Sequence, residues 1–232
     1  MGRRGKKAGP AIEKEEDIML CFAEEIFLLA LDDREGALKP LPVSALEYAL
    51  PGALLIELAF LDKIDIDLKS LQAVDRVPTG NSLLDDVLRQ IEGKSELQPT
   101  SYWLSFFADQ AGQIQERVLA QLVAKGILKI EDKKILWVFK TRRYPVMDNR
   151  EIKEVKTRLR ELIMSDDIPD PREAVLISLA DACHLLDDLF SDEEYERFQP
   201  RIKALAKLDL IGQEVAKSIR EIAQAMALAM MP

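Results

Sequence analysis

The sequence is poor in the side chains on which most catalytic sites depend. It contains one histidine, His184, and two cysteines, Cys21 and Cys183, among 232 residues. A hydrolase of the Ser-His-Asp or Cys-His kind needs a histidine beside its nucleophile. Cys183 and His184 are neighbours in a predicted helix, where adjacent side chains point about 100° apart. They cannot form a nucleophile and base pair, and this excludes a thiol protease.

Ligands for metal ions and nucleotides are equally scarce. Asp181, His184, Asp187 and Asp188 share a predicted helical face, but a di-metal site in a helical bundle requires a second histidine. We therefore interpret this face as a solvated helix surface. The phosphate-binding patterns G-x-x-x-x-G-K-S/T and G-x-G-x-x-G are absent. We expect no metal, no cofactor and no enzymatic activity.

The chain also lacks long apolar runs, C-x-x-C pairs and excess positive charge. No run approaches the ~18 apolar residues of a membrane-spanning helix, and the N-terminus MGRRGKKAGP lacks the apolar stretch of a secretory signal. Both cysteines lie in apolar helical patterns, which predict buried thiols in a reducing cytoplasm. The net charge is −9, so attraction to an anionic surface has to be local. We expect a cytoplasmic protein that is soluble or peripheral at a membrane.

Positive charge is concentrated in one short stretch. From Lys125 to Arg143, seven basic residues stand against Glu131 and Asp132, which gives 7 − 2 = +5. Residues 161–200 hold twelve acidic and two basic residues, which gives 2 − 12 = −10. Such an asymmetry can present the basic stretch to an anionic partner. Its basic residues are Lys125, Lys129, Lys133, Lys134, Lys140, Arg142 and Arg143.

Helical periodicity covers most of the chain. Residues 1–16 predict a flexible tail, and residues 17–232 predict one domain. Pro51 either separates two helices or kinks one, and Gly52 beside it permits close packing of a neighbour. Alternating apolar residues from Ile64 to Leu68 are typical of a short strand, and a β-hairpin is predicted at about 127–139, with EDK (131–133) as an acidic tip. The predicted helices are 18–31, 45–64, one that is capped by Thr79, Asn81 or Ser82 and ends at Gly93, 113–125, 151–164, 171–190, 192–208 and 210–230.

Four apolar segments occur in a distinctive order and spacing. They are EEIFLLALDDREG (24–36), PGALLIELAFLDKI (51–64), PTGNSLLDDVL (78–88) and ERVLAQLVAKGIL (116–128). Together they resemble the Golgi phosphoprotein 3 family, whose eukaryotic members are peripheral Golgi proteins that bind phosphatidylinositol 4-phosphate. The resemblance implies a mainly α fold: a compact helical domain around a central helical bundle, with a projecting β-hairpin. In relatives this hairpin inserts into the bilayer or pairs with a second subunit.

The resemblance also implies a basic headgroup pocket near the hairpin, and here the sequence departs from the family. Relatives use a tryptophan after the first helix, an arginine opening the next helix, and two basic residues three apart. This chain has no tryptophan in that loop, Pro51 at the arginine position, and Gly112 and Gln115 at the basic positions; Arg117 persists just downstream. Each charge-assisted hydrogen bond is worth roughly 1.5–3 kcal/mol. We therefore do not carry specificity for phosphatidylinositol 4-phosphate over to this chain.

The hairpin region nevertheless has the composition of a membrane-contacting element. Its apolar run ILWVF (135–139) is flanked by basic residues, each of which contributes about 1 kcal/mol near an anionic surface. An equally weighted interpretation is that alternate residues pack on the body and on a partner hairpin. The candidate headgroup residues are Lys39, Arg117, Lys129, Lys133, Lys134, Arg142 and Arg143. The candidate insertion or dimer residues are Ile135, Leu136, Trp137, Val138 and Phe139.

These observations predict a non-enzymatic, peripheral membrane-associated protein that binds anionic, phosphoinositide-like lipid headgroups. The alternative hypothesis is an interaction adaptor that self-associates as a homo-oligomer through the hairpin, without lipid binding, and whose basic tail, Arg3–Lys7, contacts an acidic partner. A winged-helix nucleic-acid binder is a third interpretation. It is disfavoured because QIQERVLAQLVAKG, in the place of a recognition helix, has only Arg117 and Lys125 as basic residues. We therefore expect no nucleic-acid partner.

Overall fold

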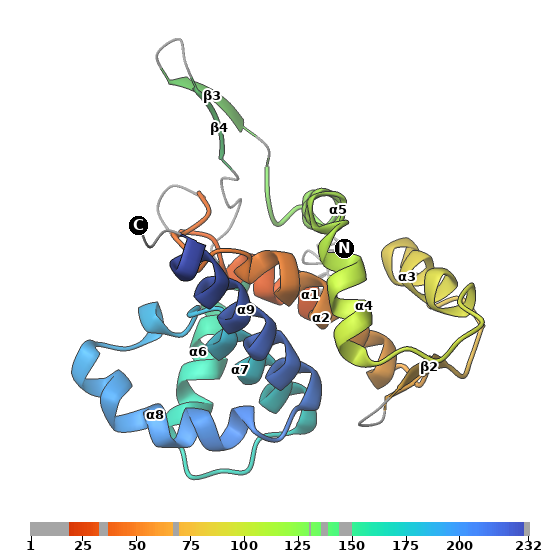
Figure 1. Cartoon of the computed structure of the whole chain (residues 1–232). Helices are drawn as coiled ribbons and strands as arrows, with labels where there is room; N and C mark the ends of the chain where they lie inside the picture. Colours follow the sequence, from red (N-terminus) through yellow and green to blue (C-terminus); the bar gives the residue numbers. More distant parts are fainter. Residues whose placement is uncertain are drawn as a thin grey trace, which may run out of the picture.

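A computed structural model describes residues 19–32, 37–66, 70–129, 131–135, 139–143 and 150–229 of the chain. It is mainly α-helical, with helices packed around α2 and the β3–β4 hairpin projecting from one end (Figure 1). The elements follow in the order α1 (Phe22–Leu29), α2 (Ala45–Phe60), β1 (Ile64–Ile66), β2 (Leu71–Ala73), α3 (Ser82–Glu92), α4 (Thr100–Ala108), α5 (Ala111–Ala124), β3 (Glu131–Ile135), β4 (Phe139–Arg143), α6 (Arg150–Met164), α7 (Pro171–Ala182), the 3-10 helix η1 (Asp187–Leu189), α8 (Asp192–Ala206) and α9 (Leu210–Ala229).

Helix α2 occupies the centre because it is apolar on nearly every side. It contacts α1, α3, α4, α5, α7, α9 and β1, and its residues from Ala49 to Leu58 are buried. Pro51 lies inside one continuous helix, which settles the choice between two helices and one. A Cβ at Gly52 would lie 2.6 Å from Val215 Cγ2, so the glycine allows α9 to approach α2 closely, as predicted. The expected central helical bundle is confirmed.

Several helices begin at capping residues that can be recognised in the sequence. The Asn81 side chain accepts a hydrogen bond from the Leu83 N–H at 3.0 Å and caps α3, which ends before Gly93. Asp170 and Glu173 form a capping box at the start of α7. Side-chain oxygens at these positions satisfy N–H groups that have no partner within the helix. Sequence reasoning therefore located these ends well.

Helix α7 is shorter than predicted. It ends at Ala182 instead of continuing to residue 190, and His184 follows it with φ of +57°. The His184 N–H donates to the Asp181 carbonyl at 3.1 Å and the Leu185 N–H donates to the Ala180 carbonyl at 2.9 Å. This is the Schellman arrangement, which closes a helix with a left-handed residue. The predicted helical face of Asp181, His184 and the following aspartates is therefore wrong.

Two antiparallel pairs of strands are present in the described residues. Ile64–Ile66 pairs with Leu71–Ala73, so the predicted strand at Ile64 has a partner that the sequence pattern did not reveal. Residue Leu68 lies outside the described residues. Strand β3 pairs with β4, with Ile135 opposite Phe139. None of the helices in the described residues is both long and apolar enough to cross a membrane.

The β3–β4 hairpin lies further along the chain than the predicted bounds. It spans 131–143 instead of about 127–139, and the residues EDK (131–133) belong to β3 instead of forming the tip. Ile127 and Leu128, which were expected in the first strand, are buried in the core. Burial of these two residues moves the start of the hairpin away from the body. The predicted hairpin bounds and acidic tip are therefore wrong.

Charge pairing explains the observed register. Glu131 stands opposite Arg143, and Asp132 stands opposite Arg142. Oppositely charged residues in directly opposed positions of an antiparallel pair stabilise that register, whereas like charges weaken it. Glu131 and Asp132 therefore lie at the base of the hairpin, and the pair formed by Ile135 and Phe139 lies at the other end of the described ladder.

Replacing Gly52 with alanine is expected to destabilise the protein. The added Cβ would overlap Val215 Cγ2, and forcing extra volume into a packed core typically costs about 1–3 kcal/mol. Urea denaturation measures this change in the free energy of unfolding. Gly112→Ala is the matched control, because a Cβ there meets no atom within 4 Å and alanine favours a helix by about 0.5–1 kcal/mol. Equal destabilisation by both substitutions would contradict the close approach of α2 and α9.

Candidate functional site

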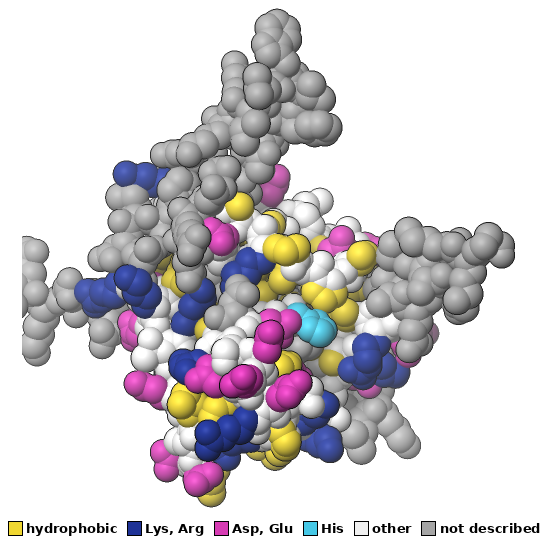
Figure 2. Space-filling view, turned by 90° about the vertical axis from the view of Figure 1, so that its left-hand side faces the viewer, with side chains coloured by type: hydrophobic (Ala, Val, Ile, Leu, Met, Phe, Trp, Pro, Cys, Tyr) yellow, Lys and Arg dark blue, Asp and Glu magenta, His cyan; other side chains and the backbone are white. Residues whose placement is uncertain are grey.

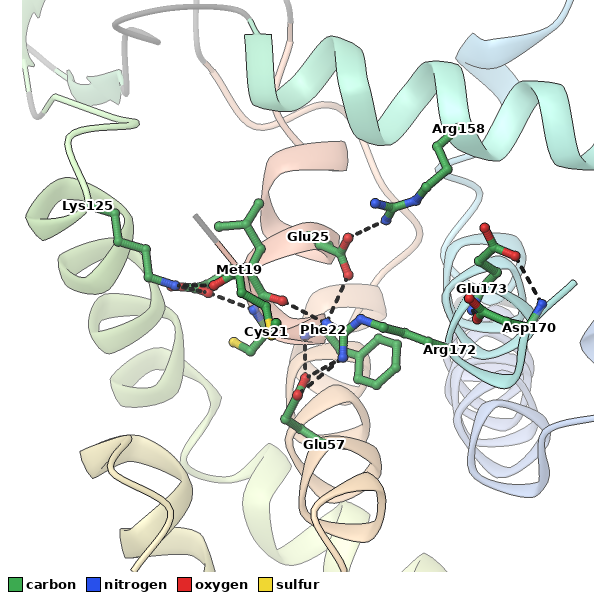
Figure 3. A network of polar contacts seen from close by, with 12 residues as sticks. Met19, Cys21, Phe22, Glu25, Glu57, Lys125, Arg158, Asp170, Arg172 and Glu173 are labelled. Atoms are coloured by element: carbon green, nitrogen blue, oxygen red, sulfur yellow. Dashed lines mark hydrogen bonds and ion pairs between the residues drawn. The ribbon is translucent and has the colours of Figure 1, made fainter. Parts of the chain in front are cut away.

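Three carboxylates are buried where the helices that flank the hairpin meet the core. Glu24 and Glu25 lie on α1 and Glu57 lies on α2; their exposed fractions are 0%, 3% and 9%. A charge is taken out of water at a large cost unless it is paired and hydrogen-bonded. Lys125, Arg158 and Arg172 supply the three opposite charges (Figure 3). We call these six residues the buried charge network.

Each carboxylate of the buried charge network has a cation and a further donor or a second cation. Lys125 Nζ lies 2.6 Å from Glu24 Oε2, which also accepts the Cys21 N–H at 2.8 Å. Glu57 Oε2 accepts the Phe22 N–H at 2.7 Å, and Arg172 approaches the other oxygen of Glu57 at 3.2 Å. These bonds satisfy two N–H groups at the start of α1.

The two arginines meet at Glu25. Arg158 on α6 donates to Glu25 Oε1, and Arg172 Nη2 lies 3.3 Å from Glu25 Oε2. Arg172 also donates to the Leu20 carbonyl at 2.7 Å and stacks its guanidinium 4.0 Å from the centre of the Phe22 ring. Arginine suits this position because its planar fork binds several acceptors and packs on aromatic rings.

The buried charge network fixes both ends of the hairpin to the same turn of α1. Lys125 is the C-cap of α5, just before the hairpin, and Arg158 lies on α6, just after it. Their partners, Glu24 and Glu25, are consecutive residues. The hairpin is the segment between two anchored helices, and the network therefore determines where it leaves the body.

Sequence reasoning did not find the buried charge network. The sequence does contain a sign of it: glutamates occur inside the apolar runs FAEEIFLL and ALLIELAF. A glutamate buried in such a run requires a positively charged or hydrogen-bonding partner. The partners could not be assigned from the sequence, since Arg172 lies 147 residues from Glu25. Lys125 was counted in the basic stretch, although its charge is used by Glu24.

Two predicted headgroup residues are used inside the body of the protein. Lys39 donates from Nζ to the Leu29 carbonyl at 2.9 Å, at the end of α1. Arg117 on α5 contacts Asp86 Oδ2 at 2.5 Å and Ser82 Oγ at 3.2 Å, which joins α5 to α3. Both side chains therefore have hydrogen-bond partners in the body of the protein, and their role at a headgroup stays a prediction.

The remaining predicted headgroup residues belong to the hairpin or its approach. Lys129 is exposed just before β3. On the strands, Lys133 stands opposite Thr141, and Lys134 stands opposite Lys140. Arg142 and Arg143 stand opposite the acidic residues Asp132 and Glu131. The excess positive charge of the hairpin therefore belongs to Lys133, Lys134 and Lys140, which we call the distal lysines.

The predicted insertion residues surround the end of the hairpin. Ile135 ends β3 and pairs with Phe139, which begins β4. Leu136, Trp137 and Val138 lie outside the described residues. The predicted alternation of residues 135–139 between the body and a partner hairpin therefore falls largely outside the described residues and stays a prediction.

The body does not restore the family's basic pocket at the positions where the resemblance implied it. Pro51 is buried in α2, Gly112 is exposed in the first turn of α5, and Gln115 is partly buried in α5. Figure 2 shows Lys and Arg side chains interspersed with Asp and Glu over the face that it presents. Within the described residues, the hairpin is the segment in which basic positions gather beside an apolar run.

Both cysteines are buried, as predicted. Burial raises the pKa of the Cys183 thiol to about 12. Burial, followed by the negative charge of Glu24, raises the pKa of the Cys21 thiol even further. Only a thiolate is a good nucleophile. These cysteines are therefore packing residues and not reactive groups.

Comparison with known proteins agrees with the resemblance drawn from the four apolar segments. A family model described as Golgi phosphoprotein 3 (GPP34) matches residues 22–222. The vacuolar protein sorting-associated protein 74 of Schizosaccharomyces pombe is 28% identical to this chain, and the match covers 85% of this chain and 67% of that protein. The region matched by the family model begins at α1 and ends within α9, so it includes the buried charge network and the hairpin.

Arg172→Met is expected to destabilise the protein strongly. The substitution leaves Glu57 with a single hydrogen-bond donor and Glu25 with one cation, and breaking a buried ion pair costs about 3–5 kcal/mol. The lower end of that range applies, because the Arg172 side chain is 32% exposed. Arg76→Met is the control: its side chain is 82% exposed and lies 3.9 Å from Glu92. Urea denaturation showing equal losses for both variants would contradict the role of the buried charge network.

The two thiols are expected to be inert in the folded protein. Because their pKa values are raised, both stay protonated as pH rises through 8, where an ordinary thiol begins to ionise. A chromogenic disulfide reagent such as DTNB should modify neither cysteine at pH 8 and both in denaturant. Rapid modification of the native protein would contradict their burial.

Proposed function

This chain belongs to the Golgi phosphoprotein 3 (GPP34) family, and from that premise we propose that it is a non-enzymatic, peripheral membrane-associated protein. It docks on anionic lipid headgroups through the β3–β4 hairpin, on the cytoplasmic side of a membrane. The observation that carries this proposal is the hairpin itself, in which lysines flank an apolar end and project from an anchored base. Apolar insertion and positive charge are the two signals that together hold a protein at an anionic membrane.

The headgroup contacts are assigned to the distal half of the hairpin. Lys133, Lys134 and Lys140 stand opposite no acidic residue, in contrast to the positions at the base. Lys134 and Lys140 are directly opposed, and like charges in that position repel each other unless an anion lies between or near them. Binding through such residues follows total negative charge and not one headgroup, consistent with the absence of the family's basic pocket. Lys39 and Arg117 are not assigned to this site, because Lys39 hydrogen-bonds to the Leu29 carbonyl and Arg117 to Asp86.

The lack of chemistry is part of the proposal. The His184 side chain is 62% exposed, and its Nδ1 lies 3.5 Å from an oxygen of Asp187 at the surface. The buried carboxylates of the network are each held by a lysine or arginine, and this role is structural. A catalytic acid or base instead needs access to the proton that it transfers.

An adaptor role is the second candidate. In the described residues β3 and β4 form a sheet of two strands, so each has an edge without a strand partner, and such edges pair readily with another chain. The name of the related S. pombe protein associates that protein with vacuolar protein sorting, which also fits an adaptor. In this role the hairpin assembles copies of the chain, and lipid is not required.

Neutralising the distal lysines is expected to abolish most vesicle binding. In the variant K133Q/K134Q/K140Q, three residues each lose about 1 kcal/mol of attraction to an anionic surface, which predicts a decrease of about 100-fold in affinity. Co-sedimentation with vesicles containing phosphatidylserine at low salt measures the affinity. The control variant K203Q/K207Q/K217Q carries the same change in net charge on α8 and α9.

The control is expected to bind as the wild type does. Equal binding by the hairpin variant and the control would overturn docking through the hairpin. Sedimentation equilibrium on the same samples tests the adaptor role. A wild-type protein that self-associates regardless of salt and ignores vesicles of every composition would favour that role instead.

A further inference from the structure

An apolar groove lies at the end of the molecule away from the hairpin. Its volume is about 480 Å³, within the range typical of small-molecule sites. It is formed by the last turns of α2, the end of β1, the loop that leads into α7, and the junction of α8 with α9; Figure 1 shows these elements on the far side from β3 and β4. Its walls include Ile56, Phe60, Ile66, Val175 and Ile211.

The groove exposes apolar side chains to water. Phe60, on one wall, is 43% exposed, and Leu208, on the opposite wall, is 67% exposed. Ile168, which precedes the lining residue Pro169, is 94% exposed. Contiguous exposed apolar surface in a soluble domain indicates a place where something binds.

The groove also contains a buried carboxylate that has no cation. Asp209 lines the groove, is 9% exposed, and makes no ion pair with any described residue. Burial raises the pKa of its carboxyl group, as expected for a charge that has lost water without gaining a positive partner. Every carboxylate of the buried charge network, by contrast, has a lysine or arginine.

Capping of α9 accounts for the position of Asp209, but it supplies no positive charge to compensate the carboxylate. Its oxygens accept the Ile211 N–H at 3.2 Å and the Gly212 N–H at 2.7 Å, and the Ser178 side chain is a third hydrogen-bond partner of the carboxylate. The carboxylate accepts with both oxygens, but none of these donors carries a positive charge. Each carboxylate oxygen has two lone pairs, so these bonds leave acceptor capacity unused.

The segments around the groove add further negative charge. The loop before α7 carries Asp166, Asp167 and Asp170, all exposed. Lys63, just before β1, forms an ion pair with Asp75. A ligand with negative charge would be repelled, and a neutral apolar ligand would leave Asp209 unpaired.

We propose that the groove binds a small amphipathic amine, with its apolar body against α2 and α7 and its ammonium group on the Asp209 carboxylate. The ammonium supplies the missing counter-charge, and charge-assisted hydrogen bonds of this kind are about twice as strong as neutral ones. The apolar chain covers Phe60 and Leu208. This site is independent of the hairpin, so its failure or success leaves the membrane proposal untouched.

The proposal is tested with three eight-carbon probes that differ only in their polar end: octylamine, octanol and octanoate. Chemical shifts of backbone amides at neutral pH, followed during titration, report affinity and location together. Octylamine should bind saturably, with shifts centred on Phe60, Val175 and Ile211. Its affinity should exceed that of octanol by about tenfold, and octanoate should bind weakest.

Asp209→Asn is the decisive variant, because asparagine removes the charge and keeps one acceptor oxygen for the cap of α9. It should lower octylamine affinity about tenfold and leave octanol unchanged, so the two probes bind alike. Asp167→Asn, in the exposed loop, is the matched control and should retain most of the preference for the amine. Phe60→Ala should lower the affinity for both probes, because it removes an apolar side chain that lines the groove.

Three results would overturn the proposal. The first is equal affinity of the wild type for octylamine and octanol. The second is an amine preference that survives Asp209→Asn. The third is saturable binding at the hairpin or no saturable binding at all. Thermal unfolding of each variant confirms that a change in affinity does not come from loss of the fold.

Discussion

The buried charges of Glu24, Glu25 and Glu57 constrain this structure more than any other feature. A carboxylate inside an apolar core is tolerated only with a cation within reach, so these three require α5, α6 and α7 to lie against α1 and α2. Apolar packing alone would accept several arrangements of the same helices. The ion pairs select one, because removing any partner leaves a buried carboxylate with fewer donors or positive charges than it has in the native structure.

The position of the hairpin relative to the body is related to this constraint. The helices that precede and follow it are fixed to neighbouring residues of α1, so the short segment between them is directed away from the body. Its acidic residues lie at the base opposite arginines, and its lysines lie toward the apolar end. The proposed membrane docking rests on these lysine positions together with the apolar residues 135–139 of the sequence.

The sequence predicted the elements better than their partners. The end of α3 was predicted correctly because Gly93 acts locally, and Asn81, one of three candidate caps, begins it. The apolar character of α2 is consistent with its central place. Helix α7 was predicted too long because His184 adopts a left-handed conformation that is unusual for its residue type. The hairpin was misplaced because its register depends on pairing between strands, which a linear pattern does not contain. Lys39 and Arg117 were assigned by charge, but their acceptors come from other helices.

Tryptophan fluorescence tests the central claim most directly. The chain has two tryptophans: Trp103 is buried at 2% exposure and should not respond to lipid, and Trp137 belongs to the apolar run of the hairpin. Vesicles rich in phosphatidylserine should shift the emission to shorter wavelength, brominated acyl chains should quench it, and high salt should reverse both effects. Emission that stays unchanged while the protein sediments with the vesicles would contradict insertion of the hairpin and place the membrane contact elsewhere.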